Sequence, residues 1–521
     1  MTLWLGWYYA RKQETTQEYF VGNGRMNPIL IGVSLFATLL STISYLSLPG
    51  EILGKGPVWM VTVIAFPLSY LAIAYWLLPV YMTQRVTSAY ELLEVKLGLS
   101  VRLLGAVMFL MLRLVWMSLL LYMTAEALVT MMGASEKLIP WVVIVAGSVA
   151  LIYTSLGGLR AVVITDLFQT ILLYGGALLV LAMVTWQMGG LGWIPTEWHE
   201  NWDTQPVFSL DPTVRVTMLG VVLNVLIWQV CTAGGDQTSV QRFMATEDLK
   251  AARKAIATQM TVAVAVNLTL AIVGVALLGY FSAHPDQIPL NKDLKADADK
   301  MFPLFIAHQL PMGISGLVIS AMFAAAMSSM DSGVNSITAV VMTDFFDRFG
   351  LSPKDEKDHV FRARILALTI GVIVVIGSSY IGQVPGNITA VTQKTTNLLT
   401  TPIFCLFFFA LFVPFSNTPG VWAGAICGVS TAVLIAFSGP IVTACVNNLG
   451  WDPYQFRVAV TEVLSEDGQT VIGYTVADPV SFQWIAPLAV LANVGVGSLV
   501  SLLTGGARAG APLLETPSSD D

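Results

Sequence analysis

The segment Phe323–Ile337, with the sequence FAAAMSSMDSGVNSI, places small and hydroxyl side chains inside an apolar stretch. Ala325, Ser328, Ser329 and Ser332 are spaced at i, i+3, i+4 and i+7, so a helix brings them to one face. Small side chains let a second backbone approach such a face closely, and the serines offer it hydroxyl oxygens. Two interpretations follow, a surface for helix packing or a binding site for a hard monovalent cation.

The composition indicates a protein that crosses a membrane many times. Hydrophobic residues make up 55% of the chain and charged residues 11%, whereas roughly a quarter of the residues of a soluble domain are charged. An N-terminal half-span that ends at Arg11 and Lys12 adds a truncated first helix, so we expect an all-α polytopic protein with about 13 transmembrane helices. The other predicted spans are 27–50, 57–82, 102–132, 138–155, 159–187, 214–234, 252–282, 304–346, 362–382, 387–413, 418–441 and 483–505.

Features outside these spans are few. The bias of lysine and arginine towards alternate loops predicts an outside N-terminus and assigns Arg242 to a cytoplasmic loop. Within an exposed loop near 442–482, apolar and β-branched residues flank Asp467-Gly468, which predicts a small β-hairpin. The four cysteines contain no CxxC pair and the four histidines show no metal-ligand spacing, so we expect no enzymatic activity.

Two spans show signs of an interrupted helix. The span 27–50 has many hydroxyl residues before Pro49, and the span 214–234 runs into Gly234-Gly235. A helix interrupted inside a membrane frees backbone carbonyls, which coordinate cations. The two spans lie five helices apart in the series, as two five-helix halves with a broken first helix would require.

Five segments of the chain resemble the sodium:solute symporter family, in particular its sialic-acid and iodide/monocarboxylate branches. The resemblance implies a leucine-transporter-type fold, a 5+5 inverted repeat, in a multi-pass protein of the plasma or bacterial inner membrane. It also implies a secondary active transporter that carries Na⁺ with a small polar organic solute, such as a sugar, sialic acid or carboxylate, by alternating access. The segments are VSLFATLLSTISYLSLPGE (Val33–Glu51), TSAYELLE (Thr87–Glu94), YTSLGGLRAVVITDLFQ (Tyr153–Gln169), SVQRFMATED (Ser239–Asp248) and AAAMSSMDSGVNSI (Ala324–Ile337).

The resemblance also implies a division of the chain. Residues 1–26 would form the truncated N-terminal helix and a cytoplasmic loop, and residues 27–413 the ten-helix transport core. Residues 414–505 would add two accessory helices, and residues 506–521 a cytoplasmic tail that we expect to be disordered. The expected partners are the solute and the lipid bilayer, with no nucleic acid and no obligate protein partner.

Na⁺ is the coupling ion that the resemblance implies. In the family, the main sodium site lies between the first and eighth core helices. Its ligands correspond here to the carbonyls of Ala37, Leu40 and Ala325 and the hydroxyls of Ser328 and Ser329. Five oxygens without a carboxylate suit Na⁺, because a divalent ion normally requires charged ligands.

A second sodium site, found in some bacterial members, corresponds here to Asp166, Asp331 and Ser332. An aspartate at 331 departs from the sialic-acid branch, where a serine is expected. Its carboxylate would tighten cation binding, become protonated or pair with a nearby cationic side chain. Asp166 is an intramembrane carboxylate, which favours a functional role, although capping a helix start is the alternative. One and two Na⁺ ions per cycle both stay open.

The solute is expected at the bilayer midplane beside the broken helices. Trp116 stands where the sialic-acid branch has a substrate-binding arginine, and Thr232 where sugar transporters have an aromatic gate. Arg113 lies on the same helix as Trp116 and would bind an anionic solute or pair structurally. The predicted lining residues are Ser41, Ser44, Trp59, Thr62, Trp116, Gln229, Thr232 and Gln393.

Two alternatives to sodium symport share the expected fold. A proton-coupled or uncoupled carrier would have a positive charge in place of Na⁺ or an incomplete hydroxyl set, which Ser328 and Ser329 argue against. A transporter-like sensor would carry a signalling domain, and none is expected after residue 505.

Overall fold

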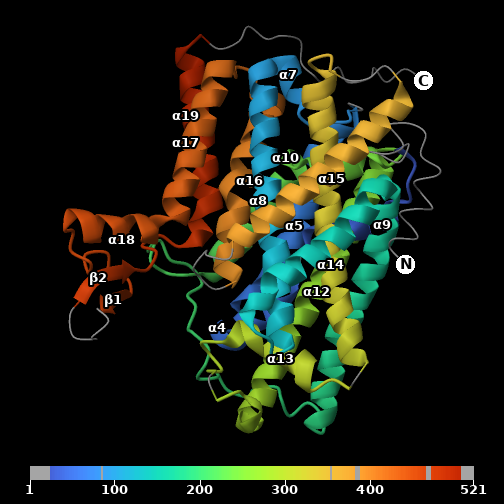
Figure 1. Cartoon of the computed structure of the whole chain (residues 1–521). Helices are drawn as coiled ribbons and strands as arrows, with labels where there is room; N and C mark the ends of the chain where they lie inside the picture. The colour runs from blue at the N-terminus through green and yellow to red at the C-terminus, as the bar shows by residue number, and fades with distance from the viewer. Residues whose placement is uncertain are drawn as a thin grey trace.

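A computed structural model describes residues 24–40, 42–83, 86–290, 292–311, 313–351, 355–381, 388–464 and 471–505. These residues form a bundle of helices with one two-stranded antiparallel sheet at its side (Figure 1). Over these ranges, 10 helices are long and apolar enough to cross a membrane, or up to 11 if one bent pair counts as a single span. The all-α polytopic architecture is therefore confirmed. The count of about 13 helices and the truncated first helix stay predictions, because residues 1–23 lie outside the described ranges.

The helices are named in chain order. Within the described residues, short π-helical and 3₁₀ segments join or extend these helices. The π-helical segments are Ile73–Leu77 and Val341–Asp347, and the 3₁₀ segments are Pro57–Ile64, Glu136–Leu138, Pro285–Gln287 and Phe482–Trp484. The α-helices are α3 (Pro28–Leu39), α4 (Thr42–Lys55), α5 (Ala65–Ala72), α6 (Leu78–Thr83), α7 (Glu91–Leu97), α8 (Leu99–Met131), α9 (Ile139–Gln187), α10 (Met218–Gly235), α11 (Gln237–Met244), α12 (Leu249–Ala283), α13 (Ala298–His308), α14 (Ile314–Val340), α15 (Glu356–Ile381), α16 (Ile388–Phe412), α17 (Thr418–Ala436), α18 (Ser438–Leu449) and α19 (Ile485–Leu503).

The first predicted interruption is present between α3 and α4, whose axes differ in direction by 66°. The side chain of Asn27 accepts a hydrogen bond from the Ile29 amide and caps the start of α3, as expected at an N-cap. At the other end, Leu40 adopts an extended conformation with φ −82° and ψ 100°, which ends the helix. Pro49 lies inside α4 rather than at the break.

The second predicted interruption separates α10 from α11 at Asp236. The Asp236 carboxylate accepts a hydrogen bond from the Thr238 amide (2.8 Å) and so caps α11. Gly235 has a packing role, because a Cβ atom there would lie 2.9 Å from both the Cα and the N atom of Phe404 in α16. Only a residue without a side chain lets α10 approach α16 this closely.

Substitution of Gly235 by alanine is expected to lower the stability of the protein. The contact is to backbone, which cannot rotate away, so α10 and α16 must separate at a cost of about 1–3 kcal/mol. A thermal denaturation series on the purified protein would measure this as a lower midpoint. Gly175→Ala in α9 is the matched control, since beyond the nearby backbone of α9 itself no heavy atom lies within 4 Å of the position that its added Cβ would take. Equal midpoints for the two variants would contradict the packing argument.

Three predicted spans have different boundaries in the structure. The spans 138–155 and 159–187 are parts of one continuous helix, α9, so Gly157-Gly158 does not end it. The span 304–346 is divided between α13 and α14, because Pro311 and Gly313, with φ +91°, separate them. An average of apolar character over a window does not register such a short break.

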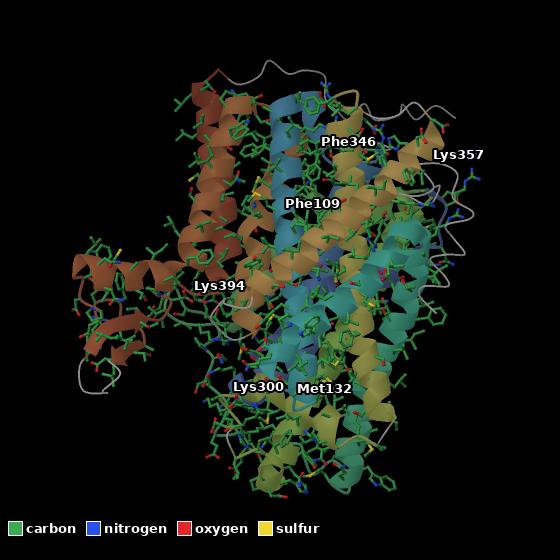
Figure 2. The ribbon with its side chains drawn as sticks, viewed as in Figure 1. Phe109, Met132, Lys300, Phe346, Lys357 and Lys394 are labelled. Atoms are coloured by element: carbon green, nitrogen blue, oxygen red, sulfur yellow. The ribbon has the colours of Figure 1, made fainter. Side chains whose placement is uncertain are left out.

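The predicted β-hairpin is confirmed by the antiparallel pairing of β1 (Val460–Leu464) with β2 (Val471–Val476). Its expected turn, Asp467-Gly468, lies outside the described residues. Helix α18 and this hairpin project sideways from the paired helices α17 and α19 (Figure 1). Lys394 of α16, labelled in Figure 2, pairs with Asp478 (2.5 Å) and so ties the chain after β2 to the bundle.

Candidate functional site

The break after α3 faces the hydroxyl surface of α14. Ser329 Oγ donates to the carbonyl oxygen of Thr38 (3.2 Å), and Thr42 Oγ1 donates to the carbonyl oxygen of Met322 (2.7 Å). Both bonds join residues almost 300 positions apart, and they hold the ends of α3 and α4 against α14. The five residues predicted to bind Na⁺ are all buried and belong to these two facing segments: Ala37, Leu40, Ala325, Ser328 and Ser329.

The break supplies the oxygen atoms that the site would need. The Leu40 amide donates a hydrogen bond to the carbonyl of Phe36 (2.7 Å), and the helical hydrogen bonds of α3 end with this bond. Carbonyls at the end of a helix lack intrahelical donors. Sequence analysis did not single out the Thr38 carbonyl, although it lies within the same helix end and accepts from Ser329.

Asp166 of α9 is fully buried beside this region. Its carboxylate accepts hydrogen bonds from the hydroxyl groups of Ser34 and Ser328. Ser328 therefore belongs both to the predicted main sodium site and to the surroundings of Asp166. The helix-capping alternative does not apply, because Asp166 lies in the interior of α9.

Arg242 of α11 is the cationic partner of Asp166 and was missed by the sequence analysis. Its Nη2 atom lies 3.6 Å from Asp166 Oδ2 and donates to Ser332 Oγ (2.6 Å), while its Nε donates to Ser34 Oγ (2.9 Å). The side chain is fully buried and belongs to α11, so the prediction that Arg242 lies in a loop is wrong, whereas its cytoplasmic side stays a prediction. A count of lysines and arginines between predicted spans assigns Arg242 to a loop, because such a count does not detect a buried partner.

The structure thus places Asp166 and Ser332, two of the three residues of the predicted second sodium site, next to the guanidinium group of Arg242. Thr38 Oγ1 lies 3.0 Å from Ser332 Oγ, which connects this group of side chains to α3. Asp331, the third residue, is buried on the same helix. A buried carboxylate requires a positive partner or hydrogen bonds, and Arg242 already provides Asp166 with that partner.

A cavity of about 170 Å³ lies next to the break, since Leu40 is part of its wall. Of the eight predicted substrate-binding residues, six line it: Ser44, Trp59, Thr62, Trp116, Gln229 and Gln393. Ser41 lies outside the described residues. Thr232 is buried but does not line the cavity, because it lies one helical turn beyond Trp228 and Gln229.

Further lining residues were missed because their positions reveal no pattern without the fold. They come from α3, α4, α5, α10, α12 and α16, and they include Ser47, Glu51, Trp228, Gln259, Asn267, Thr392 and Thr396. Arg113, by contrast, does not line the cavity. Its guanidinium pairs with the buried carboxylate of Asp236, which supports the structural alternative for this arginine.

Solved structures share the fold. A substrate-bound, outward-open Na⁺-coupled sialic acid symporter overlaps with a TM-score of 0.77 over 98% of this chain and 97% of that chain, at 22% sequence identity. MHP1, a nucleobase-cation-symport-1 family transporter, overlaps with a TM-score of 0.52 over 96% of both chains, at 11% identity. At these identities the overlap supports the leucine-transporter-type fold and nothing finer.

Relatives in sequence are sodium-coupled transporters. The sodium/sialic acid symporter SiaT of Proteus mirabilis is 28% identical over 457 residues, which cover 84% of this chain and 87% of SiaT. The sodium-dependent multivitamin transporter of Oryctolagus cuniculus is 27% identical over 98% of this chain and 82% of its own length. The human sodium/iodide cotransporter is 25% identical over 96% of this chain and 81% of its own length.

The family model named "Sodium:solute symporter family" matches residues 19–428, most of the chain. These residues include both interrupted helices, the hydroxyl face of α14 and the walls of the cavity. The family is one of sodium:solute symporters, and the relatives are named as symporters and transporters. The prediction of a transporter rather than an enzyme, with Na⁺ as coupling ion, is therefore confirmed. The chain is a multi-pass membrane protein that belongs to the sodium:solute symporter family.

Proposed function

We propose that this symporter moves a small polar organic solute with Na⁺ by alternating access. The observation that carries the proposal is the contact of the broken helix α3/α4 with the hydroxyl face of α14, directly beside the cavity. An ion bound at this contact would link two elements that must separate when the cavity changes sides. A ligand shifts such an equilibrium by its different affinity for the two states.

The proposed sodium ligands are the carbonyl oxygens of Ala37, Leu40 and Ala325 and the hydroxyls of Ser328 and Ser329. Support comes from the end of α3 at Leu40 and from the Ser329–Thr38 bond, which brings α14 within hydrogen-bonding distance of this helix end. Leu40 lies in the cavity wall as well. Bound Na⁺ would therefore stabilise the wall that contacts the solute.

The proposed stoichiometry is one Na⁺ per cycle. The alternative site of Asp166, Asp331 and Ser332 would place a second ion where the Arg242 guanidinium contacts Asp166 and Ser332. One charge moved through 100 mV releases about 2.3 kcal/mol, and a tenfold Na⁺ gradient adds about 1.4 kcal/mol. One ion thus supports a solute gradient of several hundred-fold.

The finer architecture belongs to the same proposal. Two inverted repeats of five helices within 27–413 would each begin with an interrupted helix, α3/α4 in one and α10/α11 in the other. The accessory pair would be α17 and α19, which pack on each other (Figure 1). The relatives named for sialic acid and multivitamins support a small organic solute as cargo, and no protein partner is required.

Replacement of Na⁺ tests the proposal without knowledge of the solute. The purified full chain is expected to be more stable in NaCl than in choline chloride of equal ionic strength. At a Na⁺ concentration 100 times the Kd, the gain is about 2.7 kcal/mol. Thermal denaturation in Na⁺, Li⁺, K⁺ and choline would measure it. Identical midpoints in Na⁺ and choline would contradict sodium coupling and favour the proton-coupled or uncoupled alternative.

A further inference from the structure

The described wall of the cavity of about 170 Å³ contains few ionisable side chains. Among its described lining residues, Glu51 is the one with an ionisable side chain, and none is a lysine, arginine or histidine. We infer that this symporter selects a solute without net negative charge, held by hydroxyl and amide groups. The inference rests on the proposed function, because it assumes that the cavity is the solute site.

Glu51 of α4 is buried and held in place by three hydrogen bonds. Arg215, in the chain before α10, donates from Nη1 to Oε1 (2.5 Å) and from Nη2 to Oε2 (2.9 Å). Trp59, also a cavity residue, donates from its indole nitrogen to Oε1 (3.2 Å). This bidentate geometry is that of an arginine–carboxylate ion pair, so the cavity wall contains the negative member of a pair.

The positive charge of Arg215, which neutralises Glu51, lies on the side of this carboxylate opposite to the first cavity. Arg215 lines a second cavity of about 520 Å³, and Glu51 is shared by both cavities, whereas Arg215 is absent from the wall of the first. The guanidinium also contacts the Phe482 ring at 5.6 Å, which fixes it away from the first cavity. A solute in the first cavity is therefore nearer to the negative member of the pair than to the positive one.

Other cationic side chains around the cavity already have carboxylate partners. Arg113 pairs with Asp236, Arg242 lies 3.6 Å from Asp166 and Lys394 pairs with Asp478. None of the three lines the cavity. An anionic solute would have to leave water without a basic side chain to replace its hydration, at a site that already holds a negative charge.

The remaining wall suits an uncharged, hydrogen-bonding solute. Amides both donate and accept hydrogen bonds, as hydroxyl groups do, and indole rings cover apolar ring faces. The amides are Gln229, Gln259, Asn267 and Gln393, and the indoles are Trp59, Trp116 and Trp228. A polyhydroxylated or amide-bearing ring compound matches this combination.

Matched pairs of solutes test the inference on the purified full chain in NaCl. The pairs are sialic acid and its methyl ester, glucuronate and glucose, and galacturonate and galactose, with thermal denaturation as the readout. We expect at least one uncharged member to raise the midpoint of thermal denaturation. Its apparent affinity is expected to exceed that of its anionic partner by about tenfold or more, which corresponds to a difference in binding free energy of about 1.4 kcal/mol. An anion that binds more tightly than its uncharged partner would overturn the inference, and so would a panel in which no uncharged member binds.

Two variants separate charge selection from a merely structural ion pair. Glu51→Gln leaves Arg215 without its carboxylate and is expected to raise the affinity for the anionic member relative to the uncharged one. Arg215→Gln removes the positive charge and both arginine hydrogen bonds from Glu51, and it is expected to lower the affinity for the anionic member relative to the uncharged one. If the pair is purely structural, the ratio of the affinities for the anionic and the uncharged solute changes in neither variant or in the same direction in both. Either result contradicts the inference. Stabilisation by Na⁺ alone, measured on the same samples, tests the proposed function separately. If Na⁺ does not stabilise the unsubstituted protein, that result counts against the proposed function.

Discussion

Replacement of Ser328 and Ser329 together by alanine is expected to abolish the stabilisation of the protein by Na⁺. Each substitution removes one proposed ligand oxygen, and Ser329→Ala also removes the hydrogen bond to the Thr38 carbonyl (3.2 Å). A lost hydrogen bond to a charged group costs about 1.5–3 kcal/mol, so two such losses lower Na⁺ affinity by roughly 100-fold or more. The difference between thermal midpoints in NaCl and choline chloride measures the effect.

The control for this pair is Ser320→Ala, on the exposed face of the same helix. Ser320 Oγ donates to the carbonyl of Gly316 one turn before it (2.8 Å) and contacts neither α3 nor the cavity. It removes the same hydroxyl group from α14 without changing the proposed site. Once a transported solute is known, concentrative uptake should follow the same order. Retention of full Na⁺ stabilisation and uptake by the double variant would show that α14 does not bind the ion.

Arg242→Gln is expected to produce the second large effect, a marked loss of stability. It leaves the buried Asp166 carboxylate without its cation, and removal of one partner of a buried ion pair costs about 3–5 kcal/mol. Asp166→Asn in the same background removes the unpaired charge. The double variant is therefore expected to be more stable than the sum of the two single effects predicts.

Thermal denaturation of the two single variants and the double variant would measure this coupling. Arg253→Gln serves as the control, because Arg253 donates to the carbonyl of Ala74 (2.9 Å) and lies 4.6 Å from the Tyr75 ring centroid. It is an arginine of similar chemistry whose contacts are remote from Asp166. Additive effects of the substitutions at 242 and 166 would indicate that the two side chains are not an energetic pair.

The same variant tests whether the Arg242 guanidinium occupies the position of a second cation. In the Arg242→Gln variant the space beside Asp166 and Ser332 loses its guanidinium, so a Na⁺ ion would restore the missing charge. The variant is then expected to gain more stability from Na⁺ than the unsubstituted protein gains, with a steeper dependence on Na⁺ concentration. An unchanged dependence would argue that these residues do not bind a second ion even without the arginine.

The sequence by itself determined the local properties of this protein. Apolar stretches located most of the spans, because a helix that crosses a membrane must be apolar along its whole length. The crowded hydroxyl residues and the pair Gly234-Gly235 indicated both interruptions. The period of a helix placed the serines of 323–337 on one face, which the structure turns towards α3. Each of these inferences depends on residues within one or two helical turns.

Only the tertiary structure decided which charges meet. Arg242 and Asp166 are separated by 76 positions, and Glu51 and Arg215 by 164, so no local pattern relates them. The structure places the first pair beside the proposed ion site and the second across the cavity wall. Their pairing depends on how helices pack, because a buried charge is stable only where another element brings it a partner. For that reason the sequence predicted the segments that we propose to bind the ion, while the charge of the cavity became visible only in the folded protein.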